Sequence, residues 1–462
     1  MHRAFDICIP YNNLEFADIH RRGFFVMAEV HPFRGLRYDL ACVGNLSAVI
    51  APPYDVIDAT LQQKLYDLSP YNFVRLILNK ELPTDTPTEN RYSRSARLLK
   101  EWLADGVIAQ DSARSLYVYH QDFEVEGRRY TRKGVMGRVR LEKFGEGKIY
   151  PHEETLSGPK ADRLKLFHAT NMNLSQIFGL YPDEAGEVQA KLDAAVGRSL
   201  PIQATDHLGV VSKLWAVTDQ HVISEVASLL SAKPVFIADG HHRYETALRY
   251  RDEKAATGDL KGDDAPANFV LMMLVSMSDP GLAILPTHRL ISGLDALTSA
   301  QAAAILGQHF EIEQVGSGPE AMRETWERIE MDDSQELLGF GTVADSVWQT
   351  ARFRSPDLMT QLAGEHSDDW RSLGVAILQR VVLEKLLPEA GMREPKCQYV
   401  HLLKEVDDAV VAKSCQLVAL VAPATMDHVE SIAGNLEKMP PKSTYFYPKL
   451  LTGLVVHSLR AH

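Results

Sequence analysis

The 462-residue sequence contains only four cysteines, at positions 8, 42, 397 and 415, and no CxxC pair. Scattered cysteines support neither a zinc cluster nor a disulfide framework, and they favour a reducing compartment. No stretch approaches the roughly 20 apolar residues that span a bilayer. Charged and amide residues also interrupt residues 1–27, which therefore lack the apolar core of a signal peptide. We expect a soluble, cytoplasmic protein with no membrane partner.

Excess positive charge is also missing, because 49 basic and 61 acidic residues give a net charge of −12. Such a chain is not drawn to nucleic acid non-specifically, so we expect no nucleic-acid partner. The sequence has no GxxxxGKS or GxxxxGKT phosphate loop, no GxGxxG between a strand and a helix, and no kinase or GxSxG hydrolase motif. The familiar nucleotide-binding and hydrolase folds are therefore not indicated.

The sequence is otherwise that of an ordinary globular protein, with 45% hydrophobic and 24% charged residues. Its length suggests about two or three domains. Periodicity predicts helices over residues 89–105, 219–231 and 241–256. It also predicts a hairpin from residues 115–123 and 128–140 and a strand over residues 48–51. From residue 292 onward, further helices and strands indicate a second unit. The fold class is therefore α/β, with mixed sheets.

One segment combines a buried strand, a sharp turn and a helix. The apolar run 234–238 ends at Asp239-Gly240, and His241, His242 and Arg243 open the helix. Unpaired amides and the helix dipole at such a start favour an anion such as phosphate. Arg243 would add a bidentate guanidinium, and Asp239 would hold a metal or orient a hydroxyl. The alternative is a helix capped by Asp239, with both histidines in solvent.

Residues 145–175 are polar and lack apolar periodicity, which indicates either a solvated loop or a functional loop. His152-Glu153 and Lys160-Ala161-Asp162-Arg163 are its most charged parts. Glu153 has the chemistry of a base that takes a proton from a hydroxyl. Lys160 and Arg163 have the charge to neutralise a phosphoryl group.

Two more basic segments lie in apolar surroundings, His288-Arg289 after a predicted strand and residues 442–449 near the C-terminus. The aromatic residues 445–447 lie between Lys442 and Lys449. This segment would either stack on a base and reach phosphates or pack the terminal segment onto the body.

Together these segments resemble a known family. The motifs are His31-Pro32-Phe33-Arg34-Gly35, Ala51-Pro52-Pro53-Tyr54-Asp55-Val56, the segment from His152 to Arg163, Asp239 to Tyr244, Pro286 to Arg289, and Met439 to Lys449. In this order they are similar to the prokaryotic domain-of-unknown-function family 1015, from about residue 28 to the C-terminus.

More distantly, the strand, DGHHR and helix resemble the ParB/sulfiredoxin-like fold, which includes free-serine kinases. The resemblance implies a ParB/sulfiredoxin-like nucleotide-binding core over residues 28–290, with an insertion at about 90–230. Residues 291–462 would form a C-terminal α+β domain, and residues 1–27 a leader that is either untranslated or disordered. It also implies that residues 239–243 hold nucleotide phosphates.

The first hypothesis is therefore a small-molecule kinase that uses ATP or ADP with Mg²⁺ to phosphorylate a hydroxylated metabolite, free L-serine being the first candidate. The expected catalytic residues are His152, Glu153 and Asp239. The expected phosphate-binding residues are Lys160, Arg163, Gly240, His241, His242, Arg243, His288 and Arg289. Two alternatives are a non-catalytic nucleotide-binding regulator and a metal-dependent phosphohydrolase with His152, Asp239, His241 and His242 as ligands. The sequence leaves the metal ligands of a kinase and a homo-oligomeric state open.

Overall fold

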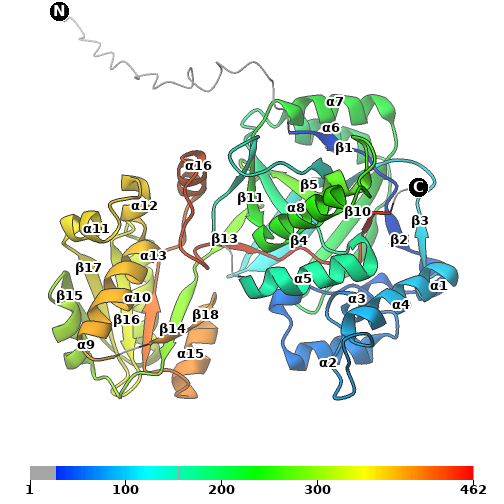
Figure 1. Ribbon diagram of the computed structural model, residues 1–462. Helices are drawn as coiled ribbons and strands as arrows, with labels where there is room; N and C mark the ends of the chain where they lie inside the picture. Colours follow the sequence, from blue (N-terminus) through cyan, green and yellow to red (C-terminus); the bar gives the residue numbers. More distant parts are fainter. Residues whose placement is uncertain (1–27, 155–156, 393, 461–462) are drawn as a thin grey trace, which may run out of the picture.

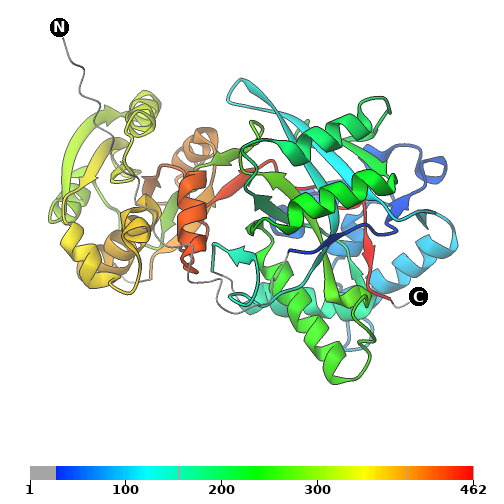
Figure 2. The ribbon, with the colours of Figure 1, turned by 90° about the horizontal axis from the view of Figure 1, so that it is seen from above.

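The structure is a computed structural model that describes residues 28–154, 157–392 and 394–460. The predicted leader, residues 1–27, lies outside the described residues. Within the described ranges, helices surround a nine-stranded and a six-stranded β-sheet that lie side by side (Figure 1). Seen from above, the two sheets occupy opposite ends of the molecule (Figure 2). The predicted mixed α/β class is confirmed.

The first sheet, called the large sheet below, contains nine of the described strands in the order β6-β11-β8-β12-β5-β4-β10-β9, with β1 paired to β5. β11 runs parallel to β6 and β12 parallel to β8, whereas the other pairs are antiparallel. The strands are β1 (Val30–His31), β4 (Leu116–Val125), β5 (Arg128–Arg140), β6 (Ile149–Pro151), β8 (Ile177–Tyr181), β9 (Ile202–Thr205), β10 (Val211–Val217), β11 (Val235–Asp239) and β12 (Phe269–Ser276).

The predicted hairpin of β4 and β5 is confirmed. Its turn residues Glu126 and Gly127 have φ angles of 50° and 75°, the positive values that a two-residue type I′ turn needs. In the strands, successive side chains alternate between the two faces of the sheet, so that Val118 and Tyr119 belong to different apolar clusters.

Helices cover both faces of the large sheet. One face packs on α6 (Glu187–Val196), α7 (Gln220–Ser231) and α8 (His241–Ala256). The other face packs on α2 (Ala59–Leu68), α3 (Val74–Ile77) and α4 (Arg91–Ala104). Shorter elements on this side are α1 (Leu40–Val43), η2 (Leu46–Ala48), η3 (Tyr54–Val56), and the pair β2 (Leu36–Tyr38) and β3 (Ile108–Gln110). The helices predicted over residues 89–105, 219–231 and 241–256 are thus confirmed as α4, α7 and α8.

The second sheet, called the small sheet, is entirely antiparallel, with the described strands in the order β15-β17-β16-β19-β14-β18. They are β14 (His288–Ser292), β15 (Phe310–Ser317), β16 (Leu337–Thr342), β17 (Val347–Phe353), β18 (Lys396–Val400) and β19 (Leu417–Leu420). One face packs on α10 (Gly318–Glu330) and α15 (Leu403–Val411). The other packs on α9 (Ser299–Leu306), α11 (Pro356–Leu362), α12 (Asp368–Ser372), and the continuous α13 (Gly374–Ile377), π-helical η5 (Leu378–Leu386) and α14 (Leu387–Glu389).

The chain returns to the large sheet after α16 (Met426–Gly434). Residues 439–460, called the C-terminal segment, cross from one sheet to the other (Figure 1). In this segment β20 (Tyr445–Tyr447) pairs with β13 (Ala283–Leu285), and β21 (His457–Ser458) pairs with β7 (Met172–Asn173). The predicted boundary near residue 290 therefore lies close to the passage between the sheets, and the division into domains stays a prediction.

Two local predictions are wrong. Residues 157–170 form helix α5 (Ser157–Thr170), which packs against α8, rather than an irregular loop. Its buried Leu164 and Phe167 are three residues apart, a helical spacing that the surrounding charges hide in the sequence. Residues 48–51 form no strand: Ala48 ends η2, and Ala51 makes only an isolated bridge to Thr452.

Candidate functional site

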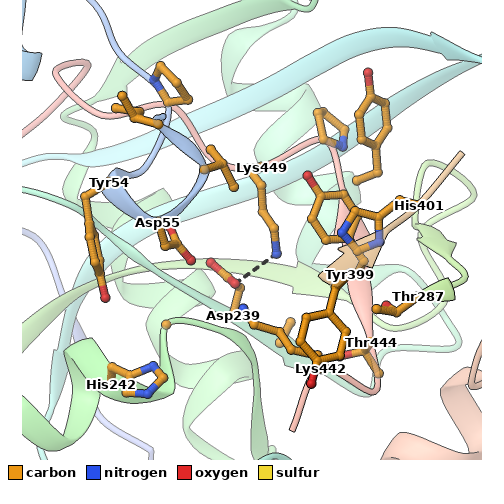
Figure 3. A pocket seen from close by; sticks show the side chains of 18 of the residues that line it. Tyr54, Asp55, Asp239, His242, Thr287, Tyr399, His401, Lys442, Thr444 and Lys449 are labelled. Carbon is orange, nitrogen blue, oxygen red and sulfur yellow. Dashed lines mark hydrogen bonds and ion pairs between the residues drawn. The ribbon is translucent and has the colours of Figure 1, made fainter. Parts of the chain in front are cut away.

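A cavity of about 890 Å³ lies where the end of β11, the edge strand β18 and the C-terminal segment meet. This volume suits a small-molecule ligand. Most of its walls come from residues 52–58, residues 153–154, the turn 238–243, residues 397–401 and residues 442–451, and residues 206–208, Thr287 and Glu405 complete the lining. Figure 3 shows the Asp239–Lys449 ion pair near the middle, between side chains of the other segments. Segments that the sequence analysis singled out separately therefore meet at one site.

The turn between β11 and α8 forms one wall of this cavity. Gly240 has φ 95°, a left-handed conformation that an L-residue adopts only with strain. The Tyr244 amide donates to the Gly240 carbonyl oxygen, N–O 2.9 Å, so the helix begins directly at the turn. The amides of the first turn, which have no partner within a helix, therefore lie at the wall formed by residues 240–243.

Asp239 is held by two cations. Its Oδ1 lies 2.9 Å from Lys449 Nζ, and its Oδ2 lies 2.6 Å from Arg243 Nη2. Burial alone raises the pKa of Asp239, but the charges of Lys449 and Arg243 outweigh it and hold the pKa well below its usual range. Asp239 is therefore a permanent anion whose two oxygens are both engaged, which suits a structural role better than that of a proton acceptor.

Arg243 is buried, and its guanidinium also donates to the Gln176 carbonyl oxygen. A Cβ added at Gly240 would lie 3.0 Å from this guanidinium. Arg243 thus lines the cavity with a guanidinium that protein oxygens engage, and its expected role as a phosphate ligand stays a prediction. The physical reason for this engagement is that Asp239, the last residue of β11, accepts from Nη2, while the Gln176 carbonyl oxygen accepts from Nη1.

His152 and His241 are both buried against each other, with ring centroids 4.8 Å apart. His152 Nδ1 donates to the Ile237 carbonyl oxygen at 2.6 Å, and its Nε2 accepts from Thr444 Oγ1 at 2.8 Å. His241 Nε2 accepts from the His152 amide at 3.3 Å. Desolvation lowers the pKa of His152 to about 4 and that of His241 well below its usual range. Both rings are neutral, and they pack against each other and the backbone beside the cavity. His242, in contrast, is partly exposed in the cavity wall.

Glu153 lies in the cavity at the end of β6, where it bridges to Met439 of the C-terminal segment. Its Oε1 accepts from the Lys442 amide, N–O 3.0 Å. Desolvation raises the pKa of Glu153, although this hydrogen bond and the charges of Lys442 and Lys449 oppose the shift. A carboxylate with a raised pKa is a stronger base than an exposed one, so Glu153 has the properties of a general base.

The remaining predicted cations lie outside the cavity lining. Lys160 Nζ lies 2.7 Å from Glu245 Oε2, an ion pair that joins α5 to α8. Arg163 is buried, donates to the Ile77 carbonyl oxygen, and stacks 3.9 Å from the centroid of Tyr54, which does line the cavity. Arg163 therefore fixes a wall residue instead of reaching a ligand.

His288 and Arg289 are also buried, at the start of β14. His288 packs edge-on against Trp326, and desolvation lowers its pKa to about 3. The Arg289 guanidinium donates to the carbonyl oxygens of Thr287 and Lys442, and desolvation lowers its pKa to about 10. Of this pair, Arg289 adjoins the cavity through its partners, whereas His288 belongs to the core of the small sheet.

The site residues expected from the sequence did not include Tyr54, Asp55, Tyr399, Lys442 and Lys449, all of which line the cavity. Four of them lie in motifs that the sequence displays: Tyr54 and Asp55 in the Pro-Pro-Tyr-Asp run, and Lys442 and Lys449 at the two sides of the aromatic triplet. The sequence signal that could have indicated Lys449 is its position as a single charged residue between Pro448 and two leucines.

Buried polar side chains of the large sheet fix the C-terminal segment at the cavity. Arg132, with no exposed surface, donates to the carbonyl oxygens of Tyr447 and Pro448. Gln121 Nε2 donates to the Lys449 carbonyl oxygen at 3.3 Å, and Gln176 Nε2 to that of Leu451 at 2.9 Å. Lys449 therefore reaches Asp239 from an anchored backbone.

A metal cluster is not formed by the part of the chain that the structure describes: no three His, Cys, Asp or Glu side chains gather in a way that could hold an ion. The set proposed for a phosphohydrolase, His152, Asp239, His241 and His242, is thus not assembled as ligands. Among the described helices, none combines the length and apolar character needed to cross a membrane.

The family is established by sequence. The model described as "Protein of unknown function (DUF1015)" matches residues 30–376, and the chain belongs to this family. The family expected from the motifs is confirmed. None of the curated proteins matches the chain.

Solved structures resemble the chain more distantly. They include a conserved hypothetical protein from Pyrococcus furiosus, with 11% identity and a TM-score of 0.33 over 66% of this chain and 89% of that one. A free serine kinase variant in complex with ADP has 12% identity and a TM-score of 0.32 over 65% and 84%. SbnI with a C-terminal truncation, from Staphylococcus aureus, has 11% identity and a TM-score of 0.33 over 69% of this chain and 86% of that one. Similarity at this level concerns the fold and assigns no ligand to this chain.

Proposed function

We propose that this protein is a phosphotransferase that moves a phosphoryl group from ATP or ADP to the hydroxyl of a small metabolite, with free L-serine as the first candidate. The observation that carries the proposal is the joint presence of a helix start and a glutamate with a raised pKa in one cavity of about 890 Å³. Phosphoryl transfer needs an anion site and a group that accepts the proton of the nucleophile.

The anion site would be the N-terminus of the 16-residue helix α8. Its first amides lie at the turn where Gly240 lets a phosphate approach the backbone closely. His242 lines the same wall one residue into the helix. Asp239 and Arg243 would act indirectly, because their mutual ion pair holds the turn in place.

Glu153 would be the general base. It takes the proton of the acceptor hydroxyl, the acceptor oxygen bonds to the terminal phosphorus, and the bond from that phosphorus to the bridging oxygen breaks. The leaving nucleotide keeps the bonding electrons, and the α8 amides stabilise the negative charge that develops on its phosphate. His152, expected as a catalytic residue, would serve only as a neutral support for the adjacent backbone.

A divalent cation such as Mg²⁺ fits this cavity. Mg²⁺ is usually bound by one or two carboxylates together with substrate phosphates. The Asp55 carboxylate is exposed in the cavity lining and forms no ion pair with the described residues, so Asp55 would hold the ion. The cation would neutralise negative charge on the transferred phosphoryl group.

Phosphorus NMR of the full chain with Mg²⁺, ATP or ADP, and a pool of small alcohols including serine tests the proposal. We expect a new phosphomonoester signal that disappears in Glu153→Gln. Glutamine keeps an oxygen for the Lys442 amide but cannot take a proton. Nucleotide affinity, measured by calorimetry, should change less than about twofold in this variant.

The matched control is Glu146→Gln, an exposed glutamate outside the cavity lining, which should form product at the wild-type rate. Binding of nucleotide without any phosphorylated product would instead favour the non-catalytic regulator. Release of inorganic phosphate alone would favour the hydrolase.

A further inference from the structure

The cavity has two chemically different ends, separated by the Asp239–Lys449 ion pair (Figure 3). One end, beside Tyr54 and Asp55, includes the apolar side chains of Val56, Ile57 and Leu451. The other end is formed by Thr287, Tyr399 and Lys442, and is called the acceptor end below. The end beside Tyr54, which combines an apolar wall with the Asp55 carboxylate proposed to hold Mg²⁺, suits the nucleotide and leaves the acceptor end for the second substrate.

Thr287 carries an unused hydroxyl at the acceptor end. The residue is only 2% exposed, and its Oγ1 has no hydrogen-bond partner among the described residues. Buried hydroxyls are nearly always paired, because a lost hydrogen bond to water is not otherwise replaced. An unpaired buried hydroxyl in a cavity wall therefore indicates a position where a ligand supplies the missing partner.

Lys442 carries an unused charge at the same end. Its side chain is exposed in the cavity and forms no ion pair or hydrogen bond with the described residues. Its backbone, in contrast, is fixed: the amide donates to Glu153, and the carbonyl oxygen accepts from Arg289 Nη2 at 3.1 Å. The ammonium thus extends from an anchored position.

Arg289 joins the three residues of the acceptor end. Its guanidinium donates to the carbonyl oxygens of Thr287 and Lys442, and its Cζ lies 5.4 Å from the ring centroid of Tyr399. No carboxylate of the described residues pairs with this guanidinium, so its charge adds to that of Lys442. Two carboxylates lie near this end. Glu405 is already bonded by the His401 and Leu402 amides, N–O 2.8 and 2.9 Å. Glu153 accepts from the Lys442 amide and is offset by the charges of Lys442 and Lys449. The acceptor end therefore favours an anionic group.

We propose that Thr287, Tyr399 and Lys442 form the acceptor subsite, and that it selects small hydroxylated molecules that also carry a carboxylate. The Lys442 ammonium binds the carboxylate, Thr287 Oγ1 hydrogen-bonds a polar group of the ligand, and the ring of Tyr399, 38% exposed, covers its carbon chain. The phosphorylated hydroxyl then lies towards Glu153. This inference rests on the proposed phosphotransfer and names its substrate class.

Matched probes separate the carboxylate from the hydroxyl. L-Serine and glycerate carry both groups, whereas serinol and glycerol have the hydroxyls without the carboxylate. Saturation-transfer NMR on the full chain should detect binding of the first pair at concentrations roughly tenfold or more below those needed for the second. Equal binding of the two pairs would overturn the inference.

Lys442→Gln and Thr287→Val should each weaken binding of L-serine or glycerate roughly tenfold, with the affinity for ADP unchanged. The control is Lys396→Gln. Lys396 is an exposed lysine outside the cavity lining, on strand β18, which also carries Tyr399, and this variant should bind both probes like the wild type. A loss of ADP affinity in Lys442→Gln with intact probe binding would contradict the assignment, because it would place Lys442 at the nucleotide phosphates.

The experiments can contradict the acceptor subsite and the proposed phosphotransferase function independently of each other. If the carboxylate probes bind in a Lys442-dependent way but no nucleotide binds, the subsite stands and the phosphotransferase falls. If nucleotide binds and uncharged alcohols are phosphorylated as readily as the hydroxy acids, the phosphotransferase stands and the subsite falls.

Discussion

Arg289 Nη2 donates to the carbonyl oxygen of Lys442 at 3.1 Å, although the two residues are 153 positions apart. This bond joins the first residues of β14 in the small sheet to the C-terminal segment, which goes on to the large sheet. Because Lys442 also contacts Glu153 through its amide, a single buried guanidinium connects the proposed base to the proposed acceptor subsite. The site therefore depends on how the two sheets are held together.

Substitution of Arg289 by lysine should separate acceptor binding from nucleotide binding. Lysine keeps the charge but lacks the planar fork that contacts two carbonyl oxygens at once. We expect the KM for the acceptor to rise about tenfold, with kcat and the affinity for ADP within about twofold of wild type. Steady-state kinetics with L-serine and calorimetry with ADP measure these quantities. An unchanged acceptor KM would show that Arg289 has no positioning role.

Thr287→Val should stabilise the protein while it weakens acceptor binding. Valine has nearly the same shape, and the buried hydroxyl that it removes makes no hydrogen bond within the described structure. Leaving such a group unsatisfied costs about 1–3 kcal/mol, so we expect the free energy of unfolding to increase by about 1 kcal/mol. Urea unfolding without ligand measures the change. A loss of stability would mean that the hydroxyl has a partner in the free protein.

Gly240→Ala should lower nucleotide affinity because the added methyl group disturbs the turn at the proposed phosphate site. A control glycine outside the site separates this effect from backbone strain. At φ 95° an alanine is strained, and its Cβ would meet the Arg243 guanidinium at 3.0 Å. The control is Gly258→Ala, just beyond the other end of α8, where φ is +75° and no atom lies within 4 Å of the added Cβ. Both variants should lose about 1 kcal/mol of stability from backbone strain. Only Gly240→Ala should bind ADP more weakly in calorimetry.

Local signals in the sequence were sufficient to predict the strand, turn and helix at the centre of the site. An apolar run, a glycine and helix-forming residues predicted β11, the turn and α8 within one residue of their observed bounds. The parallel pairing of β6 with β11 then brings Glu153 to the same cavity as Gly240. That glutamate was selected for its chemistry alone; it lines the cavity, and its role as a base stays a prediction.

The roles of the charged side chains could not be predicted from the sequence, because burial and distant partners determine them. Arg243 is a strong phosphate ligand in type, but the Asp239 carboxylate and a carbonyl oxygen engage it. The partner of Asp239 on the cavity side is Lys449, 210 positions away. No periodicity or spacing encodes a contact of that range, and only the path of the C-terminal segment brings it about.

The buried histidines should make the protein less stable in mild acid. Desolvation lowers the pKa of His152 to about 4, whereas an unfolded histidine titrates near 6.5. Between these values the unfolded chain binds a proton that the folded protein does not. The free energy of unfolding therefore falls as the pH drops from 6.5 to 4, by up to about 1.4 kcal/mol per pH unit for each such residue.

His120 and His401, whose pKa values burial likewise lowers to about 4, should add to the slope. Urea unfolding at pH 7.0, 6.0 and 5.0 measures it. His152→Gln removes one of the protons taken up on unfolding, so the slope should decrease by about one such increment, even though the variant loses stability at every pH. His221→Gln, with a side chain 82% exposed, should keep the wild-type slope. If His152→Gln kept it too, the His152 ring would be protonated in the folded protein, and its Nε2 could not accept the Thr444 hydroxyl.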